Sequence, residues 1–98
     1  MVPTDFNQGG YRRNSHALVH SLEPLPFDKF EKFLVYIQCE ERGADGNLKV
    51  YWREDRKQPI TFLPEGHVPV THIVIQLKIL GMTVKQYLAI LDHLFPEN

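Results

Sequence analysis

The histidines are the residues of this sequence best suited to chemistry, because imidazole titrates near neutral pH and binds metal ions. His16 and His20 are four residues apart, the spacing that places two zinc ligands on one face of a helix. No glutamate follows His16 as in the HExxH motif and no third ligand is near in the sequence, so no metal site is predicted. His67 lies in a loop, where functional residues are frequent, and is the candidate for catalysis; the alternative is a solvated surface group.

The other groups that could act in catalysis have no supporting pattern. Cys39 is followed by two glutamates, whose charges would raise the pKa of the thiol instead of activating it, so a buried structural cysteine is predicted. Ser15 and Ser21 lack the GxSxG turn of hydrolases, and no glycine-rich phosphate loop is present. We therefore expect neither a covalent nucleophile nor a small-molecule cofactor.

A local basic cluster is the remaining candidate for a binding site. Five of the eleven cations lie within residues 42–57, beside Tyr51 and Trp52. Phosphate contacts and base stacking require cations next to an exposed aromatic ring. The predicted nucleic-acid contacts are Lys49, Tyr51, Arg53, Arg56 and Lys57. The alternative is an ordinary charged outer face of a hairpin, because three acidic residues in the same stretch weaken the positive field.

The elements that must position these residues can be predicted from residue 28 onward. Asp28 with Glu31 is typical of a helix start, and the apolar spacing after it predicts a helix that Gly43 ends near Arg42. Residues 34–37 are also compatible with a strand. Residues 44–47 predict a turn, and the runs at 48–53 and 60–63 predict an antiparallel hairpin.

The direction of the side chains in the first predicted strand matters for the basic cluster. Leu48, Val50 and Trp52 alternate with polar residues, the period of a half-buried strand. These three side chains are expected to face the core, so the outer face of the hairpin is expected to carry Lys49, Tyr51 and Arg53.

Two helices are predicted after the hairpin. Thr71 can cap the first, which Gly81 ends, and Thr83 with Gln86 forms a capping box at the start of the second, which Pro96 ends. Helices on one face of a small antiparallel sheet of two or three strands make an α+β domain, expected over residues 27–98. Residues 1–26 are expected to form an arm that is flexible or marginally docked.

Composition limits the class of protein. The chain has 98 residues, of which 43% are hydrophobic and 23% charged, and its net charge is −1, so a single globular domain without a strong basic field is expected. Its apolar runs are far shorter than the roughly 20 residues of a membrane helix. The single cysteine and the absence of a signal-like start favour a cytoplasmic protein.

Residues 46–91 resemble the HicA (YcfA-like) family of toxin–antitoxin ribonucleases. The resemblance covers about half of the chain and is carried by residues 46–51, 59–64, 66–67 and 80–88. It implies a fold similar to a double-stranded-RNA-binding domain and RNA as a ligand. The family's catalytic histidine would fall on Leu48, and leucine cannot transfer a proton. The resemblance therefore implies a domain that binds RNA or a partner protein without efficient ribonuclease activity, unless His67 supplies it.

A second interpretation is a non-enzymatic interaction module. The helices after residue 70 carry more apolar side chains than one core-facing side uses, and surplus apolar surface is typical of a homodimer or partner interface. The residues that supply this surplus are Val74, Ile75, Ile79 and Ile90.

Overall fold

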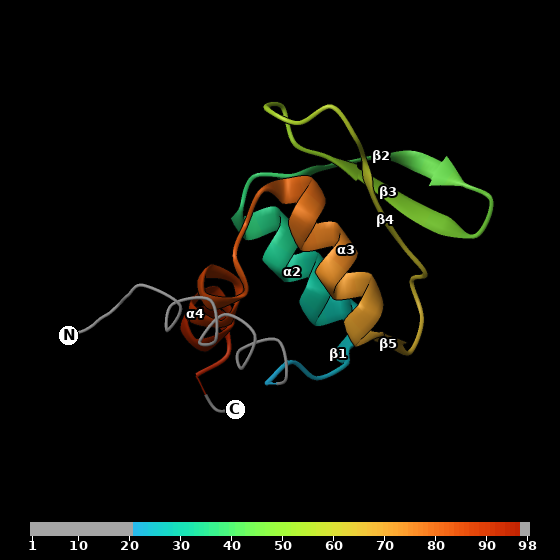
Figure 1. Ribbon diagram of the computed structural model, residues 1–98. Helices are drawn as coiled ribbons and strands as arrows, with labels where there is room; N and C mark the ends of the chain where they lie inside the picture. The colour runs from blue at the N-terminus through green and yellow to red at the C-terminus, as the bar shows by residue number, and fades with distance from the viewer. Residues whose placement is uncertain (1–20, 97–98) are drawn as a thin grey trace.

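Short strands and helices make up residues 21–96, which are the part of the chain that the computed structural model describes (Figure 1). The predictions for His16 and His20, for Ser15, and for the arm up to residue 20 lie outside the described residues. The elements in chain order are β1 (Leu25–Pro26), α2 (Phe27–Tyr36), β2 (Glu40–Asp45), β3 (Leu48–Trp52), β4 (Ile60–Phe62), β5 (His67–Val68), α3 (Val70–Leu80) and α4 (Val84–Leu94).

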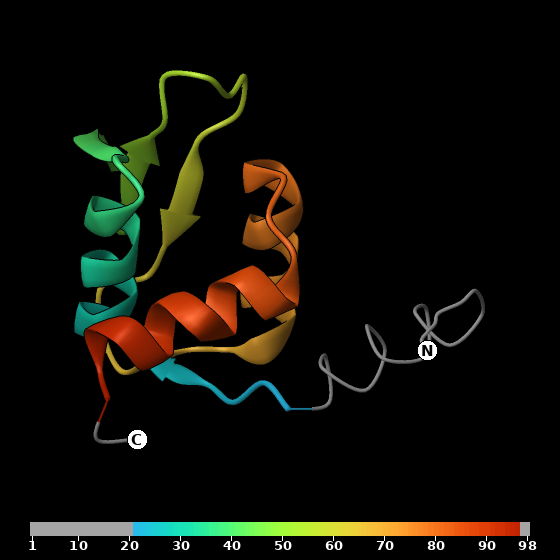
Figure 2. The ribbon, with the colours of Figure 1, turned by 90° about the vertical axis from the view of Figure 1, so that its left-hand side faces the viewer.

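The strands form two antiparallel sheets. β2, β3 and β4 make a three-stranded sheet in that order, and β1 pairs with β5 in a separate two-stranded one. α4 lies across α2 and α3, after a bend of 106° between α3 and α4 (Figure 2). This arrangement confirms the predicted α+β fold with a small antiparallel sheet and helices. Within the described residues, no single helix is long and apolar enough to span a membrane, and α3 with α4 meets that test only as a bent pair.

The core lies between α2, the sheet and the two C-terminal helices. Aromatic rings fill its centre: Phe30 meets Phe62 edge-on at 5.3 Å, and Phe33 meets Tyr87 edge-on at 5.0 Å. Tyr51 stacks on Phe62 at 5.8 Å. Cys39 is buried, as predicted. The remaining core side chains include Leu34, Ile60, Ile73, Leu77 and Leu80.

The predicted extent of the first helix is wrong, because α2 ends at Tyr36 and residues 40–45 form β2. Gln38 adopts the left-handed conformation, with φ of 71°, and its N–H donates to the carbonyl of Val35. The N–H of Cys39 donates to the carbonyl of Leu34, which completes a Schellman motif whose left-handed residue lies five residues before the glycine expected to end the helix. All six residues of β2 are exposed, so no apolar alternation marked this strand.

Glycines build the β2–β3 hairpin instead of ending a helix. Gly46 has φ of 63° at the first position of the two-residue turn, as in a type II′ hairpin. Gly43 has φ of 75° and lies where the β2–β3 register shifts between Glu41 and Ala44, which marks a β-bulge.

Two predicted helix caps are wrong and one is confirmed. The N-cap of α2 is Pro26 and that of α3 is Pro69, and neither makes a side-chain cap hydrogen bond, so Asp28 and Thr71 lie inside their helices. The capping box of α4 is present: the N–H of Gln86 donates to Thr83 Oγ1 at 3.0 Å, and the N–H of Thr83 donates to Gln86 Oε1 at 2.9 Å.

The predicted orientation of β3 is also wrong. Tyr51 is 4% exposed and faces the core, whereas Leu48, Val50 and Trp52 are half-buried on the opposite face and do not pack against the core. The pairing with β4 decides this, because Tyr51 lies opposite buried Ile60 and directly opposed residues share one face of a sheet.

Replacing Gln38 by glycine is expected to raise the free energy of unfolding by about 1 kcal/mol, because the left-handed conformation costs roughly 1–2 kcal/mol in residues other than glycine. Urea denaturation with an unchanged m-value measures the gain. Gly81 is the matched control, since it ends α3 in the same motif with φ of 69°. Gly81→Ala should be destabilising, and a Gln38→Gly variant no more stable than the original would contradict the prediction.

Candidate functional site

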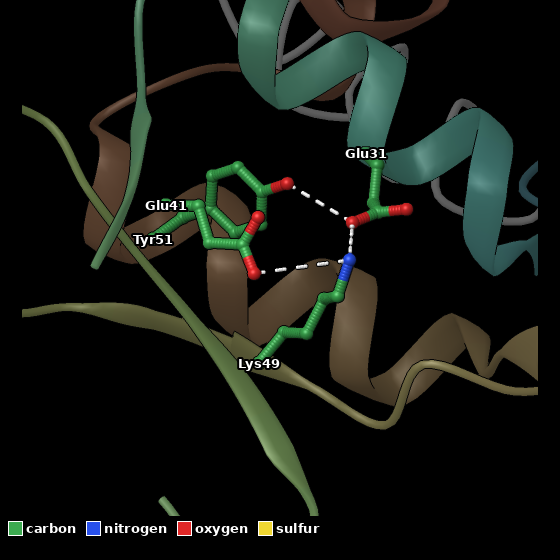
Figure 3. Close-up of polar contacts among 4 residues, drawn as sticks. All are labelled: Glu31, Glu41, Lys49 and Tyr51. Carbon is green, nitrogen blue, oxygen red and sulfur yellow. Dashed lines mark hydrogen bonds and ion pairs between the residues drawn. The ribbon is translucent and has the colours of Figure 1, made fainter. Parts of the chain in front are cut away.

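A polar cluster joins α2 to the sheet (Figure 3). Glu31 Oε2 accepts hydrogen bonds from Lys49 Nζ at 2.5 Å and from the Tyr51 hydroxyl at 3.0 Å. Lys49 Nζ also lies 3.8 Å from Glu41 Oε2 on β2. Glu31 and Lys49 are partly buried, with side chains 20% and 32% exposed. We call these four residues the Glu31 cluster.

The helical repeat places Glu31 on a side of α2 that does not fill the core. Residues 30, 33, 34 and 37 follow the core side, whereas residues 28, 31, 32, 35 and 36 share a neighbouring side by the same three- and four-residue spacing. Glu31 can therefore reach the inner face of β3 while the residues beside it stay near the surface. Val35 and Tyr36 are 60% and 49% exposed.

A surface hollow of about 520 Å³ lies beside the Glu31 cluster. Its lining residues, which define what we call the α2 hollow, are Asp28, Glu31, Lys32, Val35, Tyr36 and Tyr51. The ring of Tyr36 lies 5.5 Å from the ring of His93 on α4. The hollow thus combines aromatic and aliphatic walls with two carboxylates and one ammonium group.

Two members of the Glu31 cluster, Lys49 and Tyr51, keep their protons at neutral pH. Burial, with the hydrogen bond to Glu31 as a second cause, raises the pKa of Tyr51 far above its ordinary value. The hydrogen bond to Glu31 raises the pKa of Lys49, although partial burial opposes it. Tyr51 therefore stays neutral and Lys49 stays charged, so neither is suited to act as a general base near pH 7.

The structure does not gather the predicted cations on one open face. Lys49 and Tyr51 belong to the Glu31 cluster on the core-facing side of β3. Arg53 Nε lies 3.1 Å and Arg56 Nε 3.8 Å from the carboxylate of Asp55. Arg42, the fifth member of the sequence cluster, pairs with Glu40 at 3.0 Å, and exposed Lys57 lies in the β3–β4 loop. Their role as nucleic-acid contacts stays a prediction.

The candidate catalytic histidine lies at a second surface hollow. His67 is exposed in β5 and lines a hollow of about 530 Å³ together with His72 of α3. His72 Nε2 is 2.6 Å from the carbonyl oxygen of Thr61, so this ring nitrogen is placed to donate to the edge of β4. In the described part of the chain, no three histidine, cysteine or acidic side chains are grouped to hold a metal. Catalysis by His67 stays a prediction.

Three of the four side chains predicted as surplus apolar surface are not free. Val74, Ile79 and Ile90 pack against the core, whereas Ile75 is 52% exposed, as predicted. The helical spacing from Phe30 places Val35 away from the core, but the sequence interpretation did not use it, because residues 34–37 were also compatible with a strand.

Comparison of the chain with protein-family models, curated proteins and solved structures finds no match. The resemblance to the HicA family therefore stays a prediction. The chemistry of the chain's own surface is the guide to function.

Proposed function

We propose that this domain is a non-enzymatic protein-interaction module that binds its partner through the α2 hollow. The observation that carries the proposal is the exposure of Val35 and Tyr36, at 60% and 49%, beside a hollow walled by a second tyrosine. Large apolar and aromatic side chains next to a concave surface are typical of the centre of protein interfaces. The opposite side of α2 fills the core, so the helix presents this surface on a fixed support.

RNA is a second candidate ligand. A helix, the three-stranded antiparallel sheet and a further helix follow one another from α2 to α3, with the short strand β5 between β4 and α3, and the HicA resemblance implies a helix, a small antiparallel sheet and a closing helix. Against it, several of the hairpin cations are paired with carboxylates, and the aromatic ring expected to stack on bases is buried. In this second case Leu48 at the catalytic position still predicts inefficient cleavage. The free thiol of Cys39 supports our proposal of a cytoplasmic location for either function.

Site-specific photo-crosslinking tests the main proposal. A photoreactive amino acid at position 36, introduced in the native cells, should crosslink a protein whose identity mass spectrometry gives. With both purified proteins, Tyr36→Ala should raise the Kd by about tenfold or more, since buried interface tyrosines are frequent hot spots. Ile75→Ala on α3, similarly exposed, is the matched control and should change the Kd by less than about twofold.

Two results would overturn the proposal. One is an equal effect of Tyr36→Ala and Ile75→Ala on the partner's affinity. The other is binding to a short RNA duplex that weakens steeply with salt and is lost in the double variant Arg53→Glu, Lys57→Glu, because that combination would support RNA as the ligand.

A further inference from the structure

The α2 hollow has the composition of a site for a planar cation. Two acidic residues, Asp28 and Glu31, line it together with two tyrosines, Tyr36 and Tyr51, and Lys32 is the one cation among its described lining residues. A guanidinium group pairs with carboxylates and stacks on aromatic rings, and it gives up water more readily than an ammonium group.

One oxygen of Glu31 is available for such a group. Both hydrogen bonds of the Glu31 cluster end on Oε2, and Figure 3 shows the second carboxylate oxygen directed away from Lys49 and Tyr51. No hydrogen bond from the described residues reaches that oxygen, Oε1. Because two donors hold Oε2 from different positions on β3, the carboxylate is fixed in place before any ligand arrives.

Charge favours the same ligand. The five ionised side chains around the hollow and the cluster, which are Asp28, Glu31, Lys32, Glu41 and Lys49, carry a net charge of −1. Lys49 is shared between two glutamates, so its charge is already compensated inside the cluster. The ammonium group of Lys32 repels a cationic ligand, but this side chain is exposed and can turn away from the hollow.

We propose that the α2 hollow receives an arginine side chain of the partner protein, with the guanidinium at Glu31 and Asp28 and apolar neighbours of that arginine on Val35 and Tyr36. This inference rests on the proposed function and names the chemistry of its partner. Arginine is favoured over lysine because its planar group can meet a carboxylate oxygen and a tyrosine ring at once.

Titration of the full chain with small arginine derivatives, followed by ¹H–¹⁵N NMR, tests the inference. N-acetyl-arginine amide should give saturable shifts at the amides of residues 31–36 in the millimolar range. N-acetyl-citrulline amide has nearly the same shape without the charge, and it should bind about fivefold more weakly or worse. N-acetyl-lysine amide should lie between the two.

Charge variants locate the binding in the hollow. Asp28→Asn should weaken arginine binding by about threefold, and Lys32→Gln should strengthen it by about twofold, as expected for exposed charge pairs. Glu54→Gln, an exposed carboxylate in the β3–β4 loop, is the matched control and should leave the affinity unchanged. The amide spectrum of each variant shows whether the fold is intact.

Two results would overturn the inference. One is equal affinity for the arginine and citrulline derivatives. The other is an equal effect of Glu54→Gln and Asp28→Asn on the affinity for the arginine derivative. These failures differ from a failure of the proposed function. One result would keep the interaction surface and overturn only the cation inference. In that result Tyr36→Ala lowers the affinity for the crosslinked partner, Asp28→Asn leaves that affinity unchanged, and N-acetyl-arginine amide does not bind. If arginine binds but Tyr36→Ala leaves the partner's affinity unchanged, the proposed function falls.

Discussion

Replacing Phe33 by alanine is expected to lower the free energy of unfolding by about 4 kcal/mol, within the range measured for buried phenylalanines. Phe33 is fully buried on α2, 5.9 Å from the ring of Phe30 and 5.0 Å from the ring of Tyr87. Its removal leaves a cavity at the point where α2 and α4 meet. Because small domains are stabilised by only about 5–15 kcal/mol, this loss should move the urea midpoint strongly.

Val35→Ala on the same helix is the matched control for Phe33→Ala. Val35 is 60% exposed, so its truncation should change the free energy of unfolding by less than about 0.5 kcal/mol. Similar losses of unfolding free energy in the two variants would show that α2 does not pack on the core through the side that carries Phe33.

Replacing Glu31 by alanine is expected to lower the free energy of unfolding by about 2 kcal/mol at pH 7. The buried hydroxyl of Tyr51 loses its acceptor and is costly to leave unpaired, and the ammonium group of Lys49 loses its closer carboxylate and keeps Glu41 at 3.8 Å. Glu41→Ala is the matched control. Glu41 lies 3.8 Å from Lys49 with a side chain 49% exposed, and its loss should cost less than about 0.5 kcal/mol.

The pH dependence of the Glu31 variant provides a second measurement. The pKa of Lys49 is raised above its ordinary 10.5 by the hydrogen bond to Glu31, and that of Tyr51 is raised above 10.0 by burial and the same hydrogen bond. A raised pKa stabilises the fold fully below the ordinary value, and this stabilisation is lost as pH rises through the folded-state value. Burial still raises the pKa of Tyr51 in Glu31→Ala, so the pH-dependent stabilisation that the variant loses is chiefly that of Lys49. The stability difference between the original protein and Glu31→Ala should therefore shrink as pH rises above 10.5. A constant difference up to pH 11 would contradict this account.

Several local features could be predicted from residues close together in the chain. The Thr83–Gln86 capping box and the end of α3 at Gly81 are stabilised by hydrogen bonds within a few residues, so their sequence signals are reliable. The core side of α2 followed from the helical spacing of the apolar residues after Asp28. The β3–β4 hairpin followed from two apolar runs around a polar loop.

The errors arose where local signals were weak or ambiguous. β2 has six exposed residues without apolar alternation, and its existence depends on pairing with β3. Gln38 ends α2 in a left-handed conformation that is usually taken by glycine. The end of the helix was therefore predicted at the next glycine in the chain, Gly43. The strand alternative for residues 34–37 left the exposure of Val35 and Tyr36, which is central to the proposed site, without a prediction.

The amino-acid sequence by itself determined most of the local elements and the α+β class, because caps, turns and apolar periods act over a few residues. Only the tertiary structure decided which side of β3 is buried. Both sides of that strand carry apolar residues, and the burial of Ile60 and Phe62 on β4 turned Tyr51 and Lys49 inward. That choice placed Lys49 and Tyr51 within reach of Glu31, eighteen and twenty residues away in the chain, and so formed the candidate site. Contacts over such separations depend on how whole elements pack, which no local pattern encodes.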